Sequence, residues 1–413
     1  MTTTAEPVMS IPDLSDTATF ADDVPHDVFD ELRRRPGWYW QPTDVGTMNG
    51  GFWVVTRHAD VVEVEKNPTV FSNRRGIGYP QTTLPLDPEH NPASAFITLS
   101  DPPIHTALRK VASKAFGPRI VRQFKPWVSD IVTEALDNIE ALDEFDIVAE
   151  LAAIIPSYVI VQIMGVPRRD RQKIVDWANG QVDAVNTYDL DRLARGREEL
   201  IAYFNESLWG EKLRNPSDDM TTVVVQAYER GEITRDQAHY FLLVLVGAGF
   251  ETTHTAIAHA MRMMLEDDDV LQRMRAAIPQ VGMDAVVTEF LRVITPVMHM
   301  ARTALEDTEI CGQRVRRDDL VLLYYSAANR DPAVFSNPHV FDPLRPETGA
   351  LTFGTGIHRC LGFALAKLEL SILFEQIAQR GVQLRLNGTP RRGNSVFINQ
   401  LSSLPVARVR TED

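Results

Sequence analysis

The sequence predicts a mainly α-helical protein with small β-sheets (α+β), folded as a single large domain. Most of the chain follows a helical period, and short strand-like segments interrupt it at a few places. Its 413 residues are 44% apolar and 24% charged, which is enough for a large core and shows no sign of disorder. No linker, internal repeat or low-complexity tract offers a boundary, so we expect one domain over residues 1–413.

The first twenty residues are polar and acidic. They contain no apolar stretch for a signal peptide or membrane anchor. We therefore expect a flexible segment over residues 1–20, no membrane anchor and a cytoplasmic location. Of the two cysteines, Cys311 lies in an expected hairpin at 309–315, so a structural disulfide with Cys360 is not expected, in keeping with a reducing compartment.

Strand signals are short and widely spaced. Residues 51–57 predict a strand, and a helix should follow from about 59 to 67. Further strands are expected near 321–325 and 382–386. The Pro/Gly-rich stretch at 75–103 has no period, and long irregular loops inside compact domains are usually functional.

The segment at 101–109 reads DPPIHTALR and places His105 and Arg109 on one face of an expected helix. From 105 to 129 the chain has no Asp or Glu, although the net charge of the whole protein is −14. A solvated helix face is the simplest interpretation of this basic run, and a docking surface for an acidic protein is the alternative. The negative net charge argues against a nucleic-acid partner. The basic residues of the run are Arg109, Lys110, Lys114, Arg119, Arg122 and Lys125.

An apolar run from 240 leads into the sequence GAGFETTH at 247–254, which predicts a buried helix. Each of its two glycines costs about 1 kcal/mol relative to Ala, so we expect something flat or mobile to pass close to them. Glu251 and His254 interrupt the run well short of the roughly 20 apolar residues of a membrane span. A buried acid and alcohol are costly unless they serve each other, water or a ligand, so Glu251 and Thr252 are candidate functional residues. A bond from Thr252 to the carbonyl one turn earlier is the structural alternative, and we assign no role to His254.

Residues 353–362 read FGTGIHRCLG and run into an apolar stretch of helical spacing. The glycines permit a tight loop and a close approach of backbone to a planar ligand. Backbone N–H groups and the helix that starts after Cys360 would stabilise a thiolate, and Phe353 could shield the sulfur from water. A lone cysteine is more often a small buried hydrophobe, but these coinciding features favour a metal ligand.

The spacing F-x-x-G-x-H-x-C-x-G resembles the cytochrome P450 family of haem-thiolate monooxygenases, in which a cysteine is the axial ligand of the iron. The segment at 101–109, the A-G-x-E-T-T pattern at 248–253 and the sequence FDPLRP at 341–346 resemble further segments of the same family. The resemblance implies the cytochrome P450 fold, a buried haem b and the soluble bacterial type of member.

Site residues follow from the resemblance. Thr252 would hydrogen-bond the oxygen that is being activated and hold a water, and Glu251 would relay protons from solvent. Glu289, Arg292 and Arg345 would support the haem core structurally. His105, Arg109, Arg302 and His358 would bind the haem propionates, and Cys360 would be the metal ligand. The implied cofactor-binding residues are His105, Arg109, Arg302, Phe353, Gly354, His358, Cys360 and Gly362.

The resemblance also implies an apolar substrate pocket. A hydrophobic terpenoid, steroid or branched or alkyl chain is expected, because the stretch from 302 to 342 is similar to bacterial members that hydroxylate such compounds. Met298 and Met300 would be adaptable pocket fillers, and core packing is the alternative for both. The implied pocket residues are Gly247, Ala248, Val297, Met298 and Ile398.

Three functional hypotheses follow. The first is a monomeric monooxygenase that uses O2 and electrons from a ferredoxin with an NAD(P)H-dependent reductase. The second is a haem-thiolate binding or gas-sensing protein without turnover, and the third is a peroxide-driven hydroxylase. The pair Glu251–Thr252 favours the first, because a sensor needs no proton relay and peroxide-driven members often lack this pair.

Overall fold

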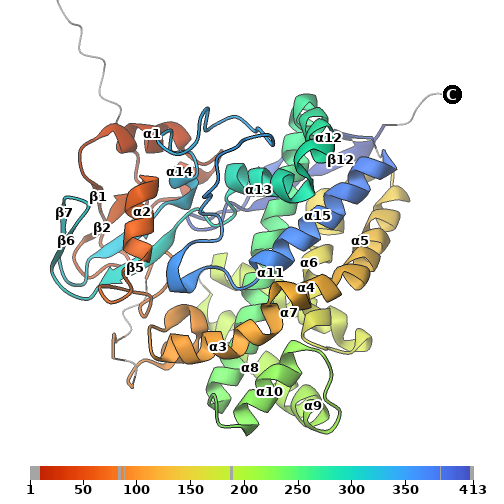
Figure 1. The fold of residues 1–413 in the computed structure, drawn as a ribbon, viewed down its shortest axis with the longest axis horizontal. Helices are drawn as coiled ribbons and strands as arrows, with labels where there is room; N and C mark the ends of the chain where they lie inside the picture. Colours follow the sequence, from red (N-terminus) through yellow and green to blue (C-terminus); the bar gives the residue numbers. More distant parts are fainter. Residues whose placement is uncertain (1–9, 82–84, 88, 187–188, 382, 410–413) are drawn as a thin grey trace, which may run out of the picture.

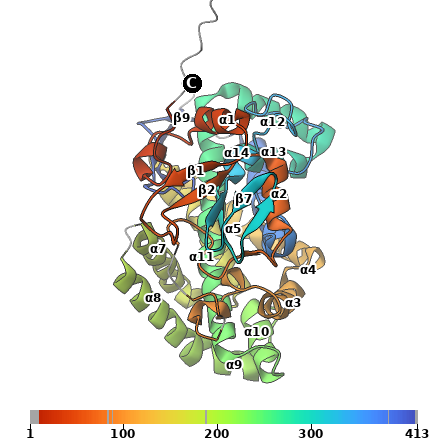
Figure 2. The same cartoon turned by 90° about the vertical axis from the view of Figure 1, so that its left-hand side faces the viewer.

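The structure, a computed structural model, describes residues 10–81, 85–87, 89–186, 189–381 and 383–409. The strands around β1, β2 and β5 gather with the first two helices in one part of the molecule, and the longer helices, together with the strand β12, lie in the rest (Figures 1 and 2). This arrangement confirms the predicted fold class, which is mainly helical with small sheets.

The N-terminal part packs on the protein from Leu14 onward. A short 3₁₀-helix, η1 (Thr17–Phe20), is capped by the Asp16 side chain, which accepts a bond from the N–H of Ala18. Leu14 and Phe20 are almost fully buried in an apolar cluster, because they pack against the helix α1 (His26–Arg34) and the strands that follow. Residues 14–20 are therefore folded, contrary to the flexible segment expected over 1–20, and the first nine residues of that segment lie outside the described ones.

The main sheet has the strand order β1-β2-β8-β5-β3. β2 and β8 pair in parallel, with Phe52 opposite Leu320, and the other neighbours are antiparallel. The expected strand at 51–57 ends at Val55, and the strand expected at 321–325 ends at Leu323, because a short helix follows. The bounds are β1 (Tyr39–Pro42), β2 (Gly51–Val55), β3 (Phe71–Ser72), β5 (Met300–Ala304), β8 (Leu320–Leu323), α2 (His58–Glu65) and α14 (Tyr325–Ala328).

Three smaller sheets complete the β structure of the described residues. The hairpin expected at 309–315 is present, and Cys311 and Gly312 form its turn with φ values of 52° and 73°. The strand expected at 382–386 begins at Leu384, and residue 382 lies outside the described ones. The pairs are β6 (Thr308–Ile310) with β7 (Gln313–Val315), β10 (Arg391–Arg392) with β11 (Leu401–Ser403), and β12 (Pro405–Arg408) between β4 (Glu144–Asp146) and β9 (Leu384–Leu386).

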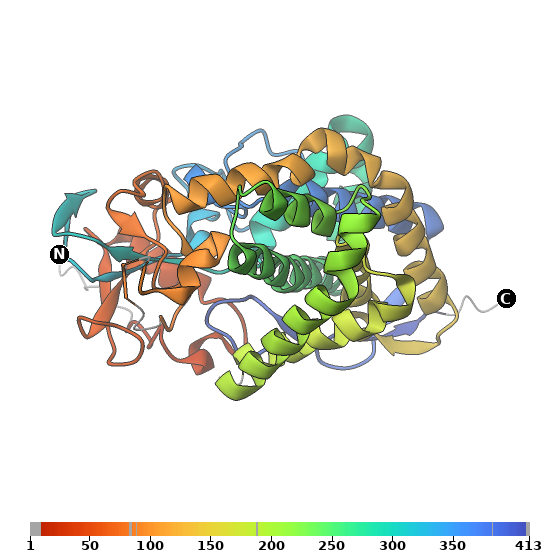
Figure 3. The same ribbon diagram turned by 90° about the horizontal axis from the view of Figure 1, so that it is seen from below.

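A long helix, α11 (Arg235–Glu266), runs through the interior of the helical part (Figure 3). A capping box starts it, in which Thr234 and Gln237 each bond the other's backbone N–H. Among the described helices α11 is the one with the length and hydropathy of a membrane span, but 67% of its apolar window is buried inside the protein. It is therefore the core helix around which the others pack.

The other helices surround α11 or extend from it. The basic run at 105–129 is divided among three of them, because Gly117 is extended and Pro118 starts a new helix. The helices are α3 (Ile104–Phe116), α4 (Pro118–Gln123), α5 (Lys125–Glu140), α6 (Ile154–Ile163), α7 (Arg171–Asn186), α8 (Leu190–Tyr203), α9 (Gly210–Arg214), α10 (Met220–Glu229), α12 (Asp268–Val281), α13 (Met283–Ile294) and α15 (Phe363–Arg380). Short 3₁₀ or π turns are η2 (Pro92–Ala95), η3 (Ile97–Leu99), η4 (Val148–Ala152), η5 (Arg168–Asp170), η6 (Phe204–Trp209) and η7 (Gly356–His358).

Candidate active site

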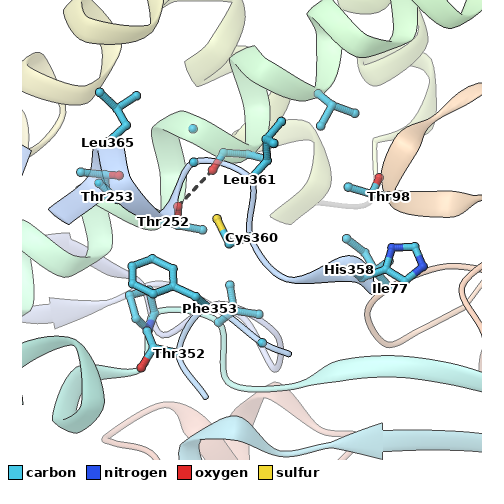
Figure 4. Close-up of a pocket in the computed structure, with 18 of the residues that line it drawn as sticks. Ile77, Thr98, Thr252, Thr253, Thr352, Phe353, His358, Cys360, Leu361 and Leu365 are labelled. Carbon is cyan, nitrogen blue, oxygen red and sulfur yellow. Dashed lines mark hydrogen bonds between the residues drawn. The ribbon is translucent and has the colours of Figure 1, made fainter. Parts of the chain in front are cut away.

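A cavity of about 260 Å³ lies between α11 and the loop that carries Cys360. Thr252 projects from α11 toward the same space as Cys360 (Figure 4). The wall is mainly apolar and includes Phe241, Val244 and Leu245 of α11. The cavity therefore joins the two motifs that the sequence placed more than a hundred residues apart.

The cysteine loop needs its glycines for two different reasons. Gly354 and Gly356 have φ values of 63° and 65°, a region that residues with a Cβ rarely adopt. A Cβ on Gly356 would also lie 2.5 Å from the backbone oxygen of Glu65. The loop closes when the N–H of Cys360 donates to the oxygen of Phe353, at 2.8 Å. This geometry holds the sulfur at one wall of the cavity.

Opposing effects act on the Cys360 thiol. Burial raises its pKa, and the N–H groups of Gly362 and Phe363 and the charges of Arg109 and Arg359 act in the opposite direction. Backbone donors and cations of this kind stabilise a thiolate once a metal is bound to the sulfur. Within the described residues no group of three or more His, Cys, Asp or Glu could hold a metal ion. A metal at Cys360 would thus need its remaining ligands from a non-protein group.

Basic side chains converge at one end of the cavity. The rings of His105 and His358 lie 4.2 Å apart, and Arg109 and Arg302 line the same wall. Burial and then Arg109 lower the pKa of His105 to about 4, and burial and then Arg302 lower that of His358 to about 2. The buried Nε2 of His358 has no hydrogen-bond partner among the described residues. The charge of Arg109 and the unpartnered ring nitrogen of His358 suit a ligand with carboxylates at that end.

The surroundings of Gly362 also suit a flat ligand in the cavity. Its φ of −83° is ordinary, and a Cβ built on it meets no protein atom within 4 Å, although it lines the cavity. Neither backbone strain nor protein packing therefore requires glycine there, and the open space beside Gly362 leaves room for a ligand. A flat group with two carboxylates and a metal bound to sulfur, which is haem, fits these residues.

One residue of this region was missed in the sequence. Glu65 at the end of α2 is 5% exposed and accepts a hydrogen bond from Arg302 Nη2 at 3.0 Å, from the Tyr325 hydroxyl, and from the N–H of Thr355 at 2.7 Å. Burial raises its pKa, and Arg302 acts in the opposite direction. Glu65 thus orients Arg302 and supports the cysteine loop. A Glu within an amphipathic helix has no distinguishing pattern, so no sequence signal could have identified it.

On α11, the two candidate residues point to different sides. Thr252 lines the cavity, and its hydroxyl donates to the oxygen of Ala248 at 3.0 Å, which is the back-bond considered as the alternative. The lone pairs of the hydroxyl remain available to accept a bond from the cavity. Glu251 is 8% exposed and is not part of the cavity wall. His254, to which we assigned no role, lies 3.7 Å from it between Nδ1 and Oε2.

One glycine of α11, Gly249, lies beside a side chain that we did not expect there. A Cβ on Gly249 would lie 2.3 Å from Cδ1 of Ile160, so a larger residue there would displace the Ile160 side chain of α6. Gly249 also lines the cavity, so the expectation that something flat or mobile passes close to it stays a prediction.

The residues predicted to form a substrate pocket are only partly found at the cavity wall. Ala248 and Val297 line the cavity, and so does Met300. Met298 does not, because its side chain is fully buried in the apolar cluster around Phe29 and Tyr324. Core packing, the alternative for Met298, is thus correct.

Two other predicted pocket residues also lie outside the wall. Gly247 is not among the lining residues, because the backbone of α11 presents Ala248 and Gly249 to the cavity instead. Ile398 forms an isolated bridge with Val297, which lines the cavity, but Ile398 is not itself a lining residue. From the irregular stretch at 75–103, Ile77, Ile97 and Thr98 reach the cavity.

The expected charge cluster around Glu289 is present. Arg292 donates to both carboxylate oxygens of Glu289 at 2.8 Å, and Arg345 Nε approaches at 3.3 Å. The N–H of Asp342 donates to the same carboxylate at 2.9 Å. These bonds tie α13 to the segment that leads into the cysteine loop, so they suit a structural role.

Relatives support the same interpretation. The family model described as Cytochrome P450 matches residues 16–380. The chain is 31% identical to a steroid C26-monooxygenase of Rhodococcus jostii, in an alignment that covers 95% of this chain and 84% of that protein. It is 32% identical to linalool 8-monooxygenase of Pseudomonas putida, in an alignment that covers 97% of this chain and 100% of that protein. The solved structure of CYP108D1 from Novosphingobium aromaticivorans is 31% identical, covers 97% of this chain and 99% of its own, and superposes with a TM-score of 0.81.

Proposed function

This chain belongs to the cytochrome P450 family, and on that premise we propose that it hydroxylates a terpenoid, steroid or branched alkyl substrate with electrons from a ferredoxin and its reductase. It is a monooxygenase that depends on haem b. The observation that carries the proposal is the single apolar cavity that has Cys360 on one wall and Thr252 on another.

The chain's own residues account for cofactor binding. Cys360 would be the iron ligand, with Phe353, Gly354 and Gly362 around it. His105, Arg109, His358 and Arg302 would receive the two propionates at the basic end of the cavity. Bound haem supplies the iron at which dioxygen is activated, while the thiolate donates electron density that favours O–O cleavage.

Thr252 and Glu251 would handle protons. The Thr252 hydroxyl donates to Ala248, which fixes its orientation and leaves its lone pairs to accept a hydrogen bond from inside the cavity. Glu251 is adjacent on the helix and holds its carboxyl out of the cavity. Rotation of this side chain past Thr252 would bring a proton from the buried interior toward the cavity. An acid placed in this way has no use in a protein that only binds a gas.

The cavity wall supports a hydrophobic, branched substrate. Ile77, Ile97, Val244, Val297 and Met300 offer apolar contacts from four separate segments. Such a wall selects by shape and apolar area rather than by charge. The relatives named for linalool and for steroid C26 oxidation act on branched hydrocarbon skeletons, which agrees with this wall.

A ferredoxin would dock on the outer face of the cysteine side. Lys110, Arg122 and Lys125 are exposed on α3, α4 and α5, and no Asp or Glu lies among the residues from 105 to 129. Complementary charge would speed the encounter with an acidic protein. We further propose that the protein works in the cytoplasm as a monomer.

Two measurements test the proposal. In the reduced protein, carbon monoxide should give the red-shifted Soret band of a thiolate-ligated haem, and Cys360→Ser should abolish that band while Cys311→Ser keeps it. The opposite result would show that the ligand assignment is wrong.

The substrate class is tested by spectral titration of the ferric protein with terpenoid alcohols, steroids and fatty acids. We expect spectral shifts at the lowest concentrations with branched compounds. Product formed from hydrogen peroxide alone, at the rate seen with ferredoxin and reductase, would favour the peroxide-driven hydroxylase. Ligand binding without any product from either system would favour the sensor.

A further inference from the structure

The helical turn that begins at Glu251 contains a group of buried polar atoms, and of these the proposed function uses only the carboxyl of Glu251. Five of them have no hydrogen-bond partner within the part of the chain that the structure describes. They are Oε1 and Oε2 of Glu251, Nδ1 and Nε2 of His254, and Oγ1 of Thr255. Buried polar groups are normally satisfied, so such a concentration in one turn requires an explanation.

The three residues share one side of α11. Positions i, i+3 and i+4 of a helix are neighbours on its surface, so His254 and Thr255 both stand over Glu251. Thr252, at i+1, is turned by about 100° and lines the cavity instead. The group thus lies behind the cavity wall, one residue away from the side chain that faces the chemistry.

His254 is held in place. Its ring stacks on that of Phe250, with centroids 5.5 Å apart and planes 17° from parallel. Nδ1 lies 3.7 Å from Oε2 of Glu251, and both side chains are almost fully buried, at 7% and 11% exposure. The distance between Nδ1 and Oε2 is within the range of an ion pair, but it is too long for a direct hydrogen bond. A small rotation of the Glu251 carboxyl is enough to close it.

The side of α11 that carries Glu251 approaches the surface further along the helix. Arg262 is eleven residues beyond Glu251, which brings it within about 20° of the same direction and about 16 Å along the axis. Its side chain is 17% exposed and pairs at 3.6 Å with the more exposed carboxylates of Asp23 and Glu266. The small Ala258 lies between the two ends on this side. A partly exposed charged group therefore stands where this side of α11 approaches the surface.

We propose that His254 is a positioning residue that holds the Glu251 carboxyl and supplies it with protons, with Thr255 completing the polar group. The proposal rests on the proposed role of Glu251 and extends it. In this step Nε2 of His254 takes up one proton from a hydronium ion, which leaves water, and Nδ1 gives one proton to Oε2 of the Glu251 carboxylate. The ring is then neutral with its proton on Nε2, and it returns to its starting form when water accepts that proton and delivers one to Nδ1, so charge balances and no electron moves.

The first test measures the pair directly in the full-length, haem-loaded protein. Nitrogen-15 NMR of the histidine rings in the reduced, carbon monoxide-bound form reports which nitrogen of His254 carries a proton. We expect Glu251→Gln to shift the Nδ1 resonance of His254 and Thr252→Ala to leave it in place. An unchanged His254 spectrum in Glu251→Gln overturns the proposal.

The second test measures product formed per NAD(P)H with the panel compound that gives the largest spectral shift. We expect a several-fold loss and a larger solvent isotope effect for His254→Phe, which keeps the ring stacking but removes both nitrogens. His254→Asn places an amide near the position of Nδ1, so it should still hold the Glu251 carboxyl, but it cannot pass protons and should keep the larger solvent isotope effect. His239→Phe is the matched control, because His239 is another buried histidine of α11 and bonds Asn205 instead.

The outcomes separate the two proposals. If Glu251→Gln and Thr252→Ala keep full product yield, the proton relay of the proposed function fails. If those variants lose yield while His254→Phe behaves like His239→Phe, only the role of His254 fails. Should His254→Phe not fold, His254→Asn and the NMR of the wild-type protein still decide the matter.

Discussion

Glu289 and Glu251 are both buried carboxylates on long helices, at 5% and 8% exposure, yet their surroundings are opposite. Glu289 has two arginines and a backbone N–H within hydrogen-bonding reach. Glu251 has one histidine at 3.7 Å and no hydrogen bond among the described residues. A carboxylate with every lone pair engaged stabilises a fold, whereas one left without bonds is free to change its proton and partner. Burial alone therefore does not distinguish a structural acid from a chemical one.

The largest effect on stability is expected at Glu289. Glu289→Ala leaves the buried guanidinium of Arg292 without its partner, and such a loss typically costs about 3–5 kcal/mol. Chemical denaturation of the haem-loaded protein measures it. Asp284→Ala on the same helix is the control, because Asp284 is 77% exposed in its pair with Lys367 and should cost less than about 1 kcal/mol. Equal losses in the two variants would remove the distinction between the two acids.

Thr252→Ala should act on chemistry and leave stability nearly intact. Loss of one oriented hydrogen-bonding group in an active site costs about 2.7–4 kcal/mol of transition-state stabilisation, a rough guide for this site. NAD(P)H should still be consumed while product falls and peroxide rises. The matched control is Thr288→Ala, since Thr288 makes the same back-bond on α13, to Asp284 at 2.7 Å, but outside the cavity. Unchanged coupling in Thr252→Ala would contradict its role.

The buried histidine His299 gives a prediction for the pH dependence of stability. Burial lowers the pKa of His299 from 6.5 to about 3, and its Nε2 accepts a bond from the N–H of Tyr79 at 3.2 Å. As pH falls below 6.5 the unfolded chain takes up this proton first, so stability is lost from there down to about pH 3. The loss from this one group is roughly 2 kcal/mol between pH 6.5 and 5.

His299→Gln should therefore flatten the pH dependence of unfolding by that amount over this interval. The measurement is the denaturation free energy at pH 7 and pH 5. His90→Gln should leave the slope unchanged, because the side chain of His90 is 74% exposed. A slope in His299→Gln equal to that of the wild type would show that His299 takes up its proton in the folded state.

The smallest effect is expected for charges that water already solvates. Reversing Lys110, Lys114 and Arg122 should slow reduction by a ferredoxin about tenfold at low salt and leave haem content unchanged. Stopped-flow reduction at low and high ionic strength measures this. Reversal of three exposed arginines elsewhere, Arg34, Arg314 and Arg317, is the control. If the two triple variants showed equal salt dependence, the basic run would be a solvated surface and not a docking site.

Arg109→Ala tests the neighbouring buried position. It should weaken haem retention and leave the salt dependence of reduction unchanged, because Arg109 lines the cavity rather than the outer face. Haem transfer to an apo-globin measures retention. Haem loss no faster than in the wild type would show that Arg109 does not hold a propionate.

Motifs whose residues are close in sequence were predicted well. All eight expected cofactor-binding residues line one cavity, because the glycine loop and the His105–Arg109 turn each carry their geometry within a few positions. Glu289 and Arg292 are likewise one helical turn apart. Glu65 was missed because its contact with Arg302 joins residues separated by 237 positions and nothing local distinguishes it.

The sequence by itself determined the helices, the thiolate loop and the family, because these depend on periodicity, on glycine conformations and on short fixed spacings. Only the tertiary structure decided which side of each element meets the cavity. The helical period places the side chains of Glu251 and Thr252 about 100° apart around α11. It does not say which of the two faces the cavity and which is covered by another helix. Likewise, Met298 and Met300 carry the same side chain, and packing alone sends one to the core and the other to the cavity. That choice depends on contacts between segments distant in sequence, which no local pattern records.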